Sequence, residues 1–165
     1  VSVLGSRCIM IVVPGAPGAP GHRFGFDHAM DSSDPASPAF VSQEGCYQLM
    51  GRRMLEHLLQ GFSTCLVCCG QAGSGKTTTV MGLAEPPSEQ GLVMRFLRDL
   101  FLEIEGMRSD GVCAALRVQM VEVYNEKVVD VLAHAEAPRA PGGEAPAPRR
   151  VDVHAHPRLG VYLRG

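Results

Sequence analysis

The chain has 165 residues, and its net charge of -2, from 15 basic and 17 acidic side chains, argues against a general nucleic-acid or anionic-membrane binder. Hydrophobic residues make up 45%, which predicts a globular chain, and the length favours one domain with a buried core. No apolar run approaches the ~20 residues that a membrane-spanning helix needs, so no transmembrane segment is predicted.

The first predicted elements are two short strands, over residues 7–13 and 24–26. Between them lies a run of glycine, alanine and proline at about 14–21, which propagates neither a helix nor a strand ladder and predicts a flexible surface loop. Ser42 is then the predicted N-cap of a helix with apolar side chains at helical spacing. That helix is expected to stop at Gly61, because glycine readily adopts the left-handed conformation that ends helices.

An uncharged apolar segment over residues 64–69 comes next and is typical of a strand covered on both faces. A helix is predicted from Lys76, and a second, amphipathic helix is predicted over residues 93–104. A polar, proline-bearing insert at 83–91 separates these two helices. Strands that alternate with helices in this way favour an α/β fold with a largely buried sheet.

The remaining predicted elements are a strand over residues 116–120, a turn at 124–126 and a terminal hairpin. The hairpin is expected to pair 150–154 with 161–164. A second low-complexity stretch, rich in proline, alanine and glycine, predicts another flexible loop at about 133–149.

Six cysteines lie mostly in apolar surroundings, and no secretory signal precedes them, which predicts reduced, buried thiols in the cytosol. They are Cys8, Cys46, Cys65, Cys68, Cys69 and Cys113. Cys65 and Cys68 have the spacing of a redox or zinc motif, but no second pair stands at ligand spacing. We therefore interpret this pair as small hydrophobic residues of a strand.

The strongest chemical signal is Gly70-Gln-Ala-Gly-Ser-Gly-Lys-Thr77, which matches the phosphate-loop pattern G-x-x-x-x-G-K-[ST] in full. Glycines let consecutive backbone N–H groups turn inward around phosphate oxygens. We expect Lys76 to bridge the β- and γ-phosphates and the Thr77 hydroxyl to ligate Mg²⁺. The predicted nucleotide-binding residues are Gly70, Gln71, Ala72, Gly73, Ser74, Gly75, Lys76, Thr77 and Thr78. The pattern alone does not separate adenine from guanine, or hydrolysis from phosphoryl transfer.

Several further motifs, in the same order along the chain, resemble those of kinesin motor domains over about residues 6–165. These segments are 24–27 (F-x-F-D), 59–62 (L-x-G-Y), 70–82 (GQTGSGKT and T-M-x-G), 91–95 (G-L-I-P-R), 118–132 (E-I-Y-N-E and D-L-L) and 156–162 (P-x-x-G-x-Y). Within the loop itself, Gln71 is the residue that most specifically indicates the kinesin family. Segments 6–9 and 41–44 lean toward the class-three, cargo-transporting kinesins.

The resemblance implies an α/β P-loop NTPase fold of the kinesin motor type, with an incomplete central sheet and flanking helices, and residues 1–165 as a partial motor domain. It implies ATP and Mg²⁺ as ligands and a parent protein that couples ATP hydrolysis to movement along microtubules, in the cytoplasm and on the cytoskeleton. It also makes His156 and Arg158, in the last hairpin, candidates for tubulin contact. No catalytic residue is assignable within these residues.

Some expected motifs are missing from the sequence. Neither switch motif of the family, N-x-x-S-S-R-S-H or D-x-A-G-S-E, occurs in the 165 residues, so we expect the chain alone to hydrolyse ATP poorly. Thr78 stands where the family carries an aromatic residue or histidine against adenine. One alternative is therefore a truncated or degenerate kinesin-like nucleotide-binding or interaction module without ATPase activity. Another is an unrelated P-loop kinase or small NTPase, against which the Tyr124-Asn-Glu126 motif counts.

Overall fold

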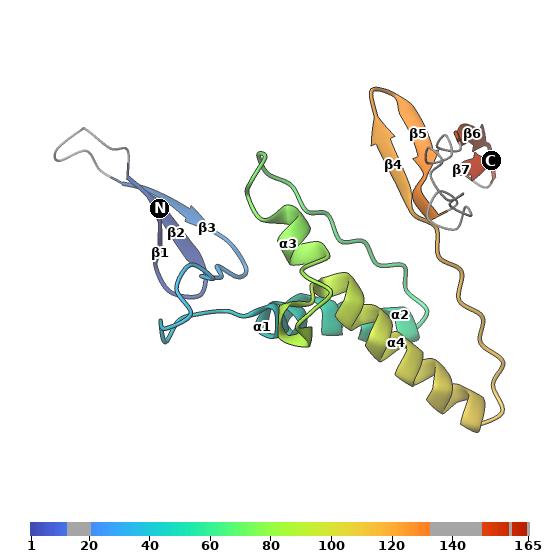
Figure 1. The fold of residues 1–165 in the computed structure, drawn as a ribbon, viewed down its shortest axis with the longest axis horizontal. Coiled ribbons are helices and arrows are strands. Elements are labelled where there is room, and N and C mark those ends of the chain that lie inside the picture. Colours follow the sequence, from blue (N-terminus) through green and yellow to red (C-terminus); the bar gives the residue numbers. More distant parts are fainter. Residues whose placement is uncertain (13–20, 133–149, 159, 165) are drawn as a thin grey trace, which may run out of the picture. The chain divides into compact units, whose positions relative to one another are not determined.

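The computed structural model describes residues 1–12, 21–132, 150–158 and 160–164 (Figure 1). The chain separates into two compact units, Val1–Cys113 and Ala114–Gly165, and each is described by itself. The loop expected at 133–149, and all but the last residue of the one expected at 14–21, lie outside the described residues.

A small antiparallel sheet opens the first unit (Figure 1). Its strands, in the order β1-β2-β3, are β1 (Ser2–Val3), β2 (Cys8–Ile11) and β3 (His22–Gly25). Ile9 of β2 stands opposite Phe24 of β3. The strands predicted at 7–13 and 24–26 are thus confirmed in place, although β3 begins before the aromatic pair and ends before Phe26.

The helix predicted to start after Ser42 is also confirmed, in three consecutive segments. These are α1 (Gln43–Cys46), a π-helical turn η1 (Tyr47–Gly51) and α2 (Arg52–Leu59). The Ser42 hydroxyl accepts a hydrogen bond from the Gly45 N–H at 3.1 Å, which satisfies one of the free donors at the helix start. Gly61 follows the helix with φ of +89°, the left-handed stop expected from the sequence.

The core of the first unit forms where η1 meets α4 (Leu92–Ser109). Tyr47 is fully buried, at 0% exposure, and clusters with Cys46 and Leu92. Gly51 allows this packing, because a Cβ at that position would lie 2.3 Å from the Tyr47 ring. The π-helical turn therefore depends on the glycine that ends it.

A polar network ties the buried tyrosine to α4. The Tyr47 hydroxyl donates to Asp99 Oδ2 at 2.7 Å, and burial, followed by this hydrogen bond, raises the pKa of Tyr47. Arg98 lies 3.0 Å and Arg52 3.8 Å from the Asp99 carboxylate. Burial acts to raise the pKa of Asp99, but the hydrogen bonds from Tyr47 and Arg98 and the two positive charges outweigh it, so the net shift is downward.

This lowered pKa predicts an acid-dependent loss of stability. An unfolded-state aspartate near its usual 3.8 takes up a proton before the folded-state carboxylate does, so the stabilisation is present above that pH and is lost as pH falls through the folded pKa. Asp99→Asn should therefore flatten the pH dependence of the unfolding free energy below about pH 4. Urea unfolding across acidic pH tests this, and Tyr47→Phe should give an intermediate slope. Parallel curves for wild type and Asp99→Asn would contradict it.

The two helices predicted around the polar insert are confirmed. α3 (Lys76–Val80) is short, whereas α4 (Leu92–Ser109) runs beyond the predicted 93–104. Between them the insert forms a single 3₁₀ turn, η2 (Pro87–Glu89). Among the described residues, each helix is too short or too polar to traverse a lipid bilayer.

Residues 64–69, predicted to be a strand covered on both faces, run as coil (Figure 1). Leu66 packs against the core cluster, whereas Val67 is 76% exposed. The prediction of two-sided burial is wrong here, because a buried strand needs neighbouring strands, and no described strand of the first unit pairs with this segment. The strand predicted at 116–120 is also wrong: those residues are coil, and Val118 is 55% exposed.

The predicted burial of the cysteines is likewise only partly confirmed. All six are free thiols, but only Cys46 is buried. Burial, with a smaller contribution from nearby Cys68, raises the pKa of the Cys46 thiol. Cys65, Cys69 and Cys113 are exposed, so the predicted burial is wrong for them, since they lie on coil that no described strand covers.

The described residues of the second unit form two hairpins. Their strands are β4 (Val121–Tyr124), β5 (Lys127–Asp130), β6 (Asp152–His156) and β7 (Gly160–Arg164). The turn expected at 124–126 is confirmed: Asn125 and Glu126 both have positive φ, at 46° and 62°, as in the tight turns that suit the twist of antiparallel strands. The terminal hairpin is confirmed as well, with His154 stacked on Tyr162 across the strands at 5.5 Å between ring centroids.

Candidate functional site

The predicted phosphate loop adopts a backbone that requires its glycines. Gly70, Gly73 and Gly75 have φ of 145°, 75° and 86°, values that other residues rarely adopt. A Cβ at Gly70 would also lie 2.6 Å from the Ser74 hydroxyl. Gly75 is the residue directly before α3. The three glycines therefore stand at the positions where the loop backbone, from residue 70 to the start of α3, needs a positive φ.

Lys76 closes this loop from the first position of α3. Its ammonium group donates to the Gly70 carbonyl at 2.9 Å and to the Gln71 carbonyl at 2.6 Å. The Ser74 N–H also donates to the Gln71 carbonyl, at 3.3 Å. The side chain is thus held beside the loop backbone by neutral acceptors. An anionic phosphate oxygen can take their place, because it forms a stronger, charge-assisted hydrogen bond with the ammonium group.

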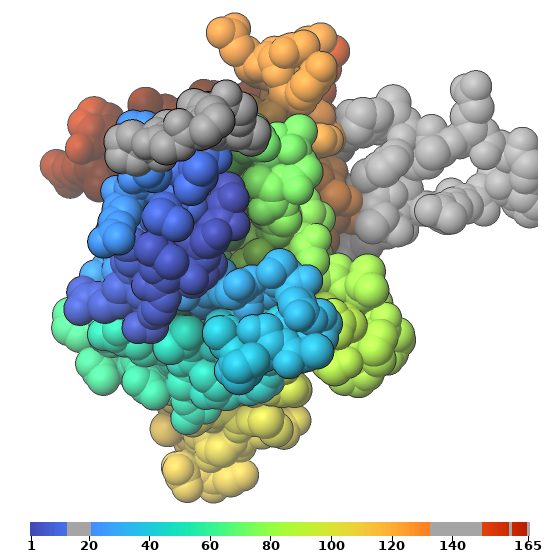
Figure 2. All heavy atoms as spheres, turned by 90° about the vertical axis from the view of Figure 1, so that its left-hand side faces the viewer, coloured from blue at the N-terminus to red at the C-terminus, as the bar shows by residue number. Residues whose placement is uncertain are grey.

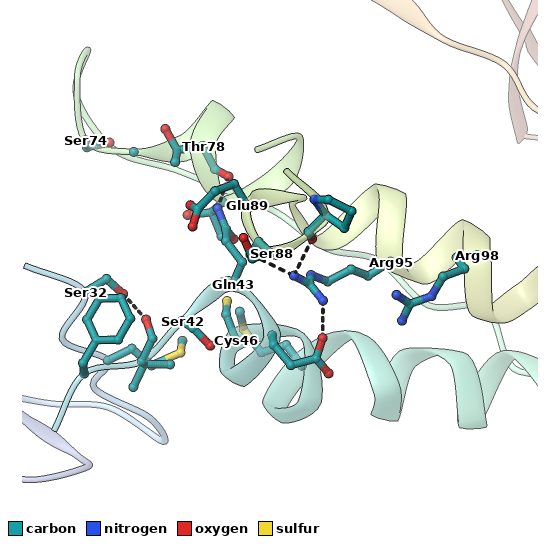
Figure 3. A pocket seen from close by; sticks show the side chains of 18 residues that line it. Ser32, Ser42, Gln43, Cys46, Ser74, Thr78, Ser88, Glu89, Arg95 and Arg98 are labelled. Atoms are coloured by element: carbon teal, nitrogen blue, oxygen red, sulfur yellow. Dashed lines mark hydrogen bonds and ion pairs between the residues drawn. The ribbon is translucent and has the colours of Figure 1, made fainter. Parts of the chain in front are cut away.

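A cavity of about 830 Å³ adjoins the loop (Figure 3). Ser74, Gly75 and Thr78 are the predicted site residues that line it, and the other six do not. Its other walls come from residues 30–50, from the polar insert and from α4. Figure 2 shows, on the first unit, residues around 30–42 (light blue) beside the insert (yellow-green). The volume lies within the range of small-molecule sites.

Arg95 forms one wall of the cavity, and the candidate site residues named from the sequence did not include it. Although charged, it is only 4% exposed. Its Nε donates to the Gln90 carbonyl at 2.8 Å. Its terminal nitrogens donate to the carbonyls of Pro87 and Ser88, at 3.1 and 3.0 Å, and to the Glu44 carboxylate (Figure 3). Arg95 thereby joins the insert to the starts of α4 and α1.

A second contact missed from the sequence joins α1 to α3. The Gln43 side-chain amide donates to the Thr78 carbonyl at 2.7 Å (Figure 3). A signal was available for Arg95, as the last residue of the G-L-V-M-R motif at 91–95. The contacts of Arg95 and Gln43 are with residues far along the chain: Arg95 and Glu44 are 51 residues apart, and Gln43 and Thr78 are 35 residues apart.

Comparison with known proteins decides the family. A model of the kinesin motor domain matches residues 14–165 of the chain. The chain belongs to the kinesin motor-domain family. Its kinesin relatives include unc-104 of Caenorhabditis elegans, 33% identical over an alignment of 165 positions that covers 96% of this chain and 10% of that protein. Another is KIF14 of Mus musculus, 35% identical over 144 residues, or 87% of this chain and 8% of that protein. The similarity to unc-104 is compatible with the predicted resemblance to class-three kinesins.

Solved kinesin structures confirm the α/β P-loop NTPase fold of this kinesin chain. A KIF14 dimer with AMP-PNP in complex with a microtubule has a TM-score of 0.75 at 29% identity and covers 99% of this chain. A fast kinesin has a TM-score of 0.72 at 22% identity, a likeness of fold. The kinesin chain spans 42% of the KIF14 structure, and its sheets are correspondingly partial.

Proposed function

We propose that this chain is the ATP-binding part of a kinesin motor domain, and that the complete domain couples ATP hydrolysis to movement along microtubules. The observation that carries the proposal is the loop geometry: three glycines with positive φ lead into α3, and the Lys76 ammonium lies within hydrogen-bond distance of two loop carbonyls. In the proposal residues 1–165 are one partial motor domain, and the complete domain acts on microtubules in the cytoplasm. His156 and Arg158 are its proposed tubulin contacts.

The roles of the loop residues follow from their chemistry. In the proposal, backbone N–H groups of residues 70–78 donate to phosphate oxygens. Lys76 exchanges its carbonyl partners for the β- and γ-phosphates, and the exposed Thr77 hydroxyl is offered to Mg²⁺. Mg²⁺ usually keeps several waters and is otherwise bound by substrate phosphates and one or two protein groups, so a single hydroxyl is a sufficient protein ligand.

Hydrolysis is proposed for the complete domain only. Phosphate binding positions the nucleotide, whereas turnover also needs a group that orients the attacking water. The switch motifs that carry this task in kinesins do not occur in the 165 residues. The chain alone is therefore expected to bind ATP and to turn it over slowly.

The proposal is tested by replacing the loop lysine. Lys76→Ala should weaken binding of Mg²⁺-ATP about tenfold to a hundredfold, because it removes a charge-assisted contact to the phosphates. Titration of a fluorescent ATP analogue, with Mg²⁺ and with a chelator, measures the effect on the 165-residue chain. Lys127→Ala is the matched control, since Lys127 is the chain's one other lysine and lies in β5. Equal affinity in all three proteins would overturn the proposal.

A further inference from the structure

The last turn of α3 leaves one of its carbonyl groups without the usual helical partner. In a continuing helix the Thr78 carbonyl would accept from the Gly82 N–H, four residues on. That N–H instead donates to the Thr77 carbonyl, at 3.2 Å, and the Met81 N–H donates to the same oxygen at 2.8 Å. The Thr78 carbonyl is thus one of the terminal acceptors that a helix must satisfy from outside.

Gln43 supplies the missing donor. Its amide Nε2 lies 2.7 Å from the Thr78 carbonyl oxygen, and Figure 3 shows the side chain directed from α1 toward α3. Gln43 is the first residue of α1, directly after the Ser42 cap, and its neighbour Glu44 is held by Arg95. The donor therefore stands on a helix start that is fixed from two sides.

We propose that Gln43 is a positioning residue for nucleotide binding, which acts through the carbonyl of Thr78 without touching the ligand. This inference rests on the proposed function. The two residues before Thr78 are Lys76 and Thr77, the proposed ligands of phosphate and of Mg²⁺. A cap on Thr78 holds the backbone of this turn against α1. Without it, the turn gains freedom, and the Mg²⁺-dependent part of the binding, which needs Thr77 in place, should fall most.

Three variants of Gln43 test the inference on the 165-residue chain. Gln43→Ala removes the donor, Gln43→Glu keeps the size but has only acceptors when ionised, and Gln43→Lys restores a donor. The matched control is Gln48→Ala, since Gln48 lies in the helical segment after α1 and donates to Glu44 Oε1 at 2.6 Å, not to α3. The dissociation constant for a fluorescent ATP analogue is measured with Mg²⁺ and with a chelator. The ratio of the two constants is independent of any change in the folded fraction.

Gln43→Ala and Gln43→Glu should each weaken Mg²⁺-ATP binding about threefold to tenfold, the typical effect of one hydrogen bond. The constant with chelator divided by the constant with Mg²⁺ should fall in both variants. This ratio should recover in part in Gln43→Lys and stay at the wild-type value in Gln48→Ala. If Lys76→Ala weakens binding but Gln43→Ala leaves the ratio unchanged, the inference is overturned and the proposed function stands. Binding that is insensitive to Lys76→Ala would overturn both.

Discussion

Replacement of Arg95 by alanine is expected to lower the free energy of unfolding by about 3 kcal/mol. The guanidinium group is buried and donates to three backbone carbonyls and one carboxylate. Alanine would leave the carbonyls of residues 87, 88 and 90 without this donor and would open space between the insert and α1. The expected loss is at the lower end of the range for broken buried pairs, because the Glu44 side chain is 48% exposed and can be hydrated.

Arg95→Lys should recover little of this loss, since an ammonium group cannot reproduce the planar fork that reaches several acceptors at once. Arg98→Ala is the control: Arg98 lies one turn away on α4, its side chain is 53% exposed, and it forms an ion pair with Asp99. Because the arginine side of this pair is half exposed, its loss should cost about 1 kcal/mol, well below the loss expected for Arg95→Ala. Urea unfolding followed by far-ultraviolet circular dichroism measures the helices α1 to α4. Equal losses in Arg95→Ala and Arg98→Ala would contradict the proposed role of Arg95.

Features set by nearby residues were predictable from the sequence. The Ser42 cap and the stop at Gly61 both act within one turn of helix, so their positions could be predicted without knowledge of the fold. The same holds for the loop that begins at Gly70, whose glycines have the positive φ that the phosphate-loop pattern requires. The family motifs added what local rules do not contain, namely the order of elements in a whole motor domain.

Features that depend on distant partners were not predictable. Residues 64–69 have the composition of a buried strand, but a ladder forms only beside another strand, and the described strands of the first unit pair elsewhere. The burial of Arg95 depends on how the insert folds back on α4, and the cap on Thr78 depends on a side chain 35 residues away. Periodicity in the sequence carries no information about such contacts.

Replacement of Tyr47 by alanine is expected to cost about 3 to 5 kcal/mol of unfolding free energy. The ring is fully buried between η1 and α4, and it covers the face left open by Gly51. Alanine would leave a cavity that the π-helical turn cannot fill without rearrangement. The variant should therefore unfold at a much lower urea concentration than the wild type.

Tyr47→Phe separates packing from hydrogen bonding at this position. It keeps the ring but removes the donor to Asp99, so the expected loss is about 1 kcal/mol, since Arg52 and Arg98 still lie beside the carboxylate. Tyr124→Ala is a control in the second unit, because that ring is 72% exposed. If Tyr47→Ala and Tyr47→Phe lost equal stability, the hydroxyl and not the ring would hold α4 against η1. A loss in Tyr47→Ala no larger than in Tyr124→Ala would show that the first unit does not depend on this core.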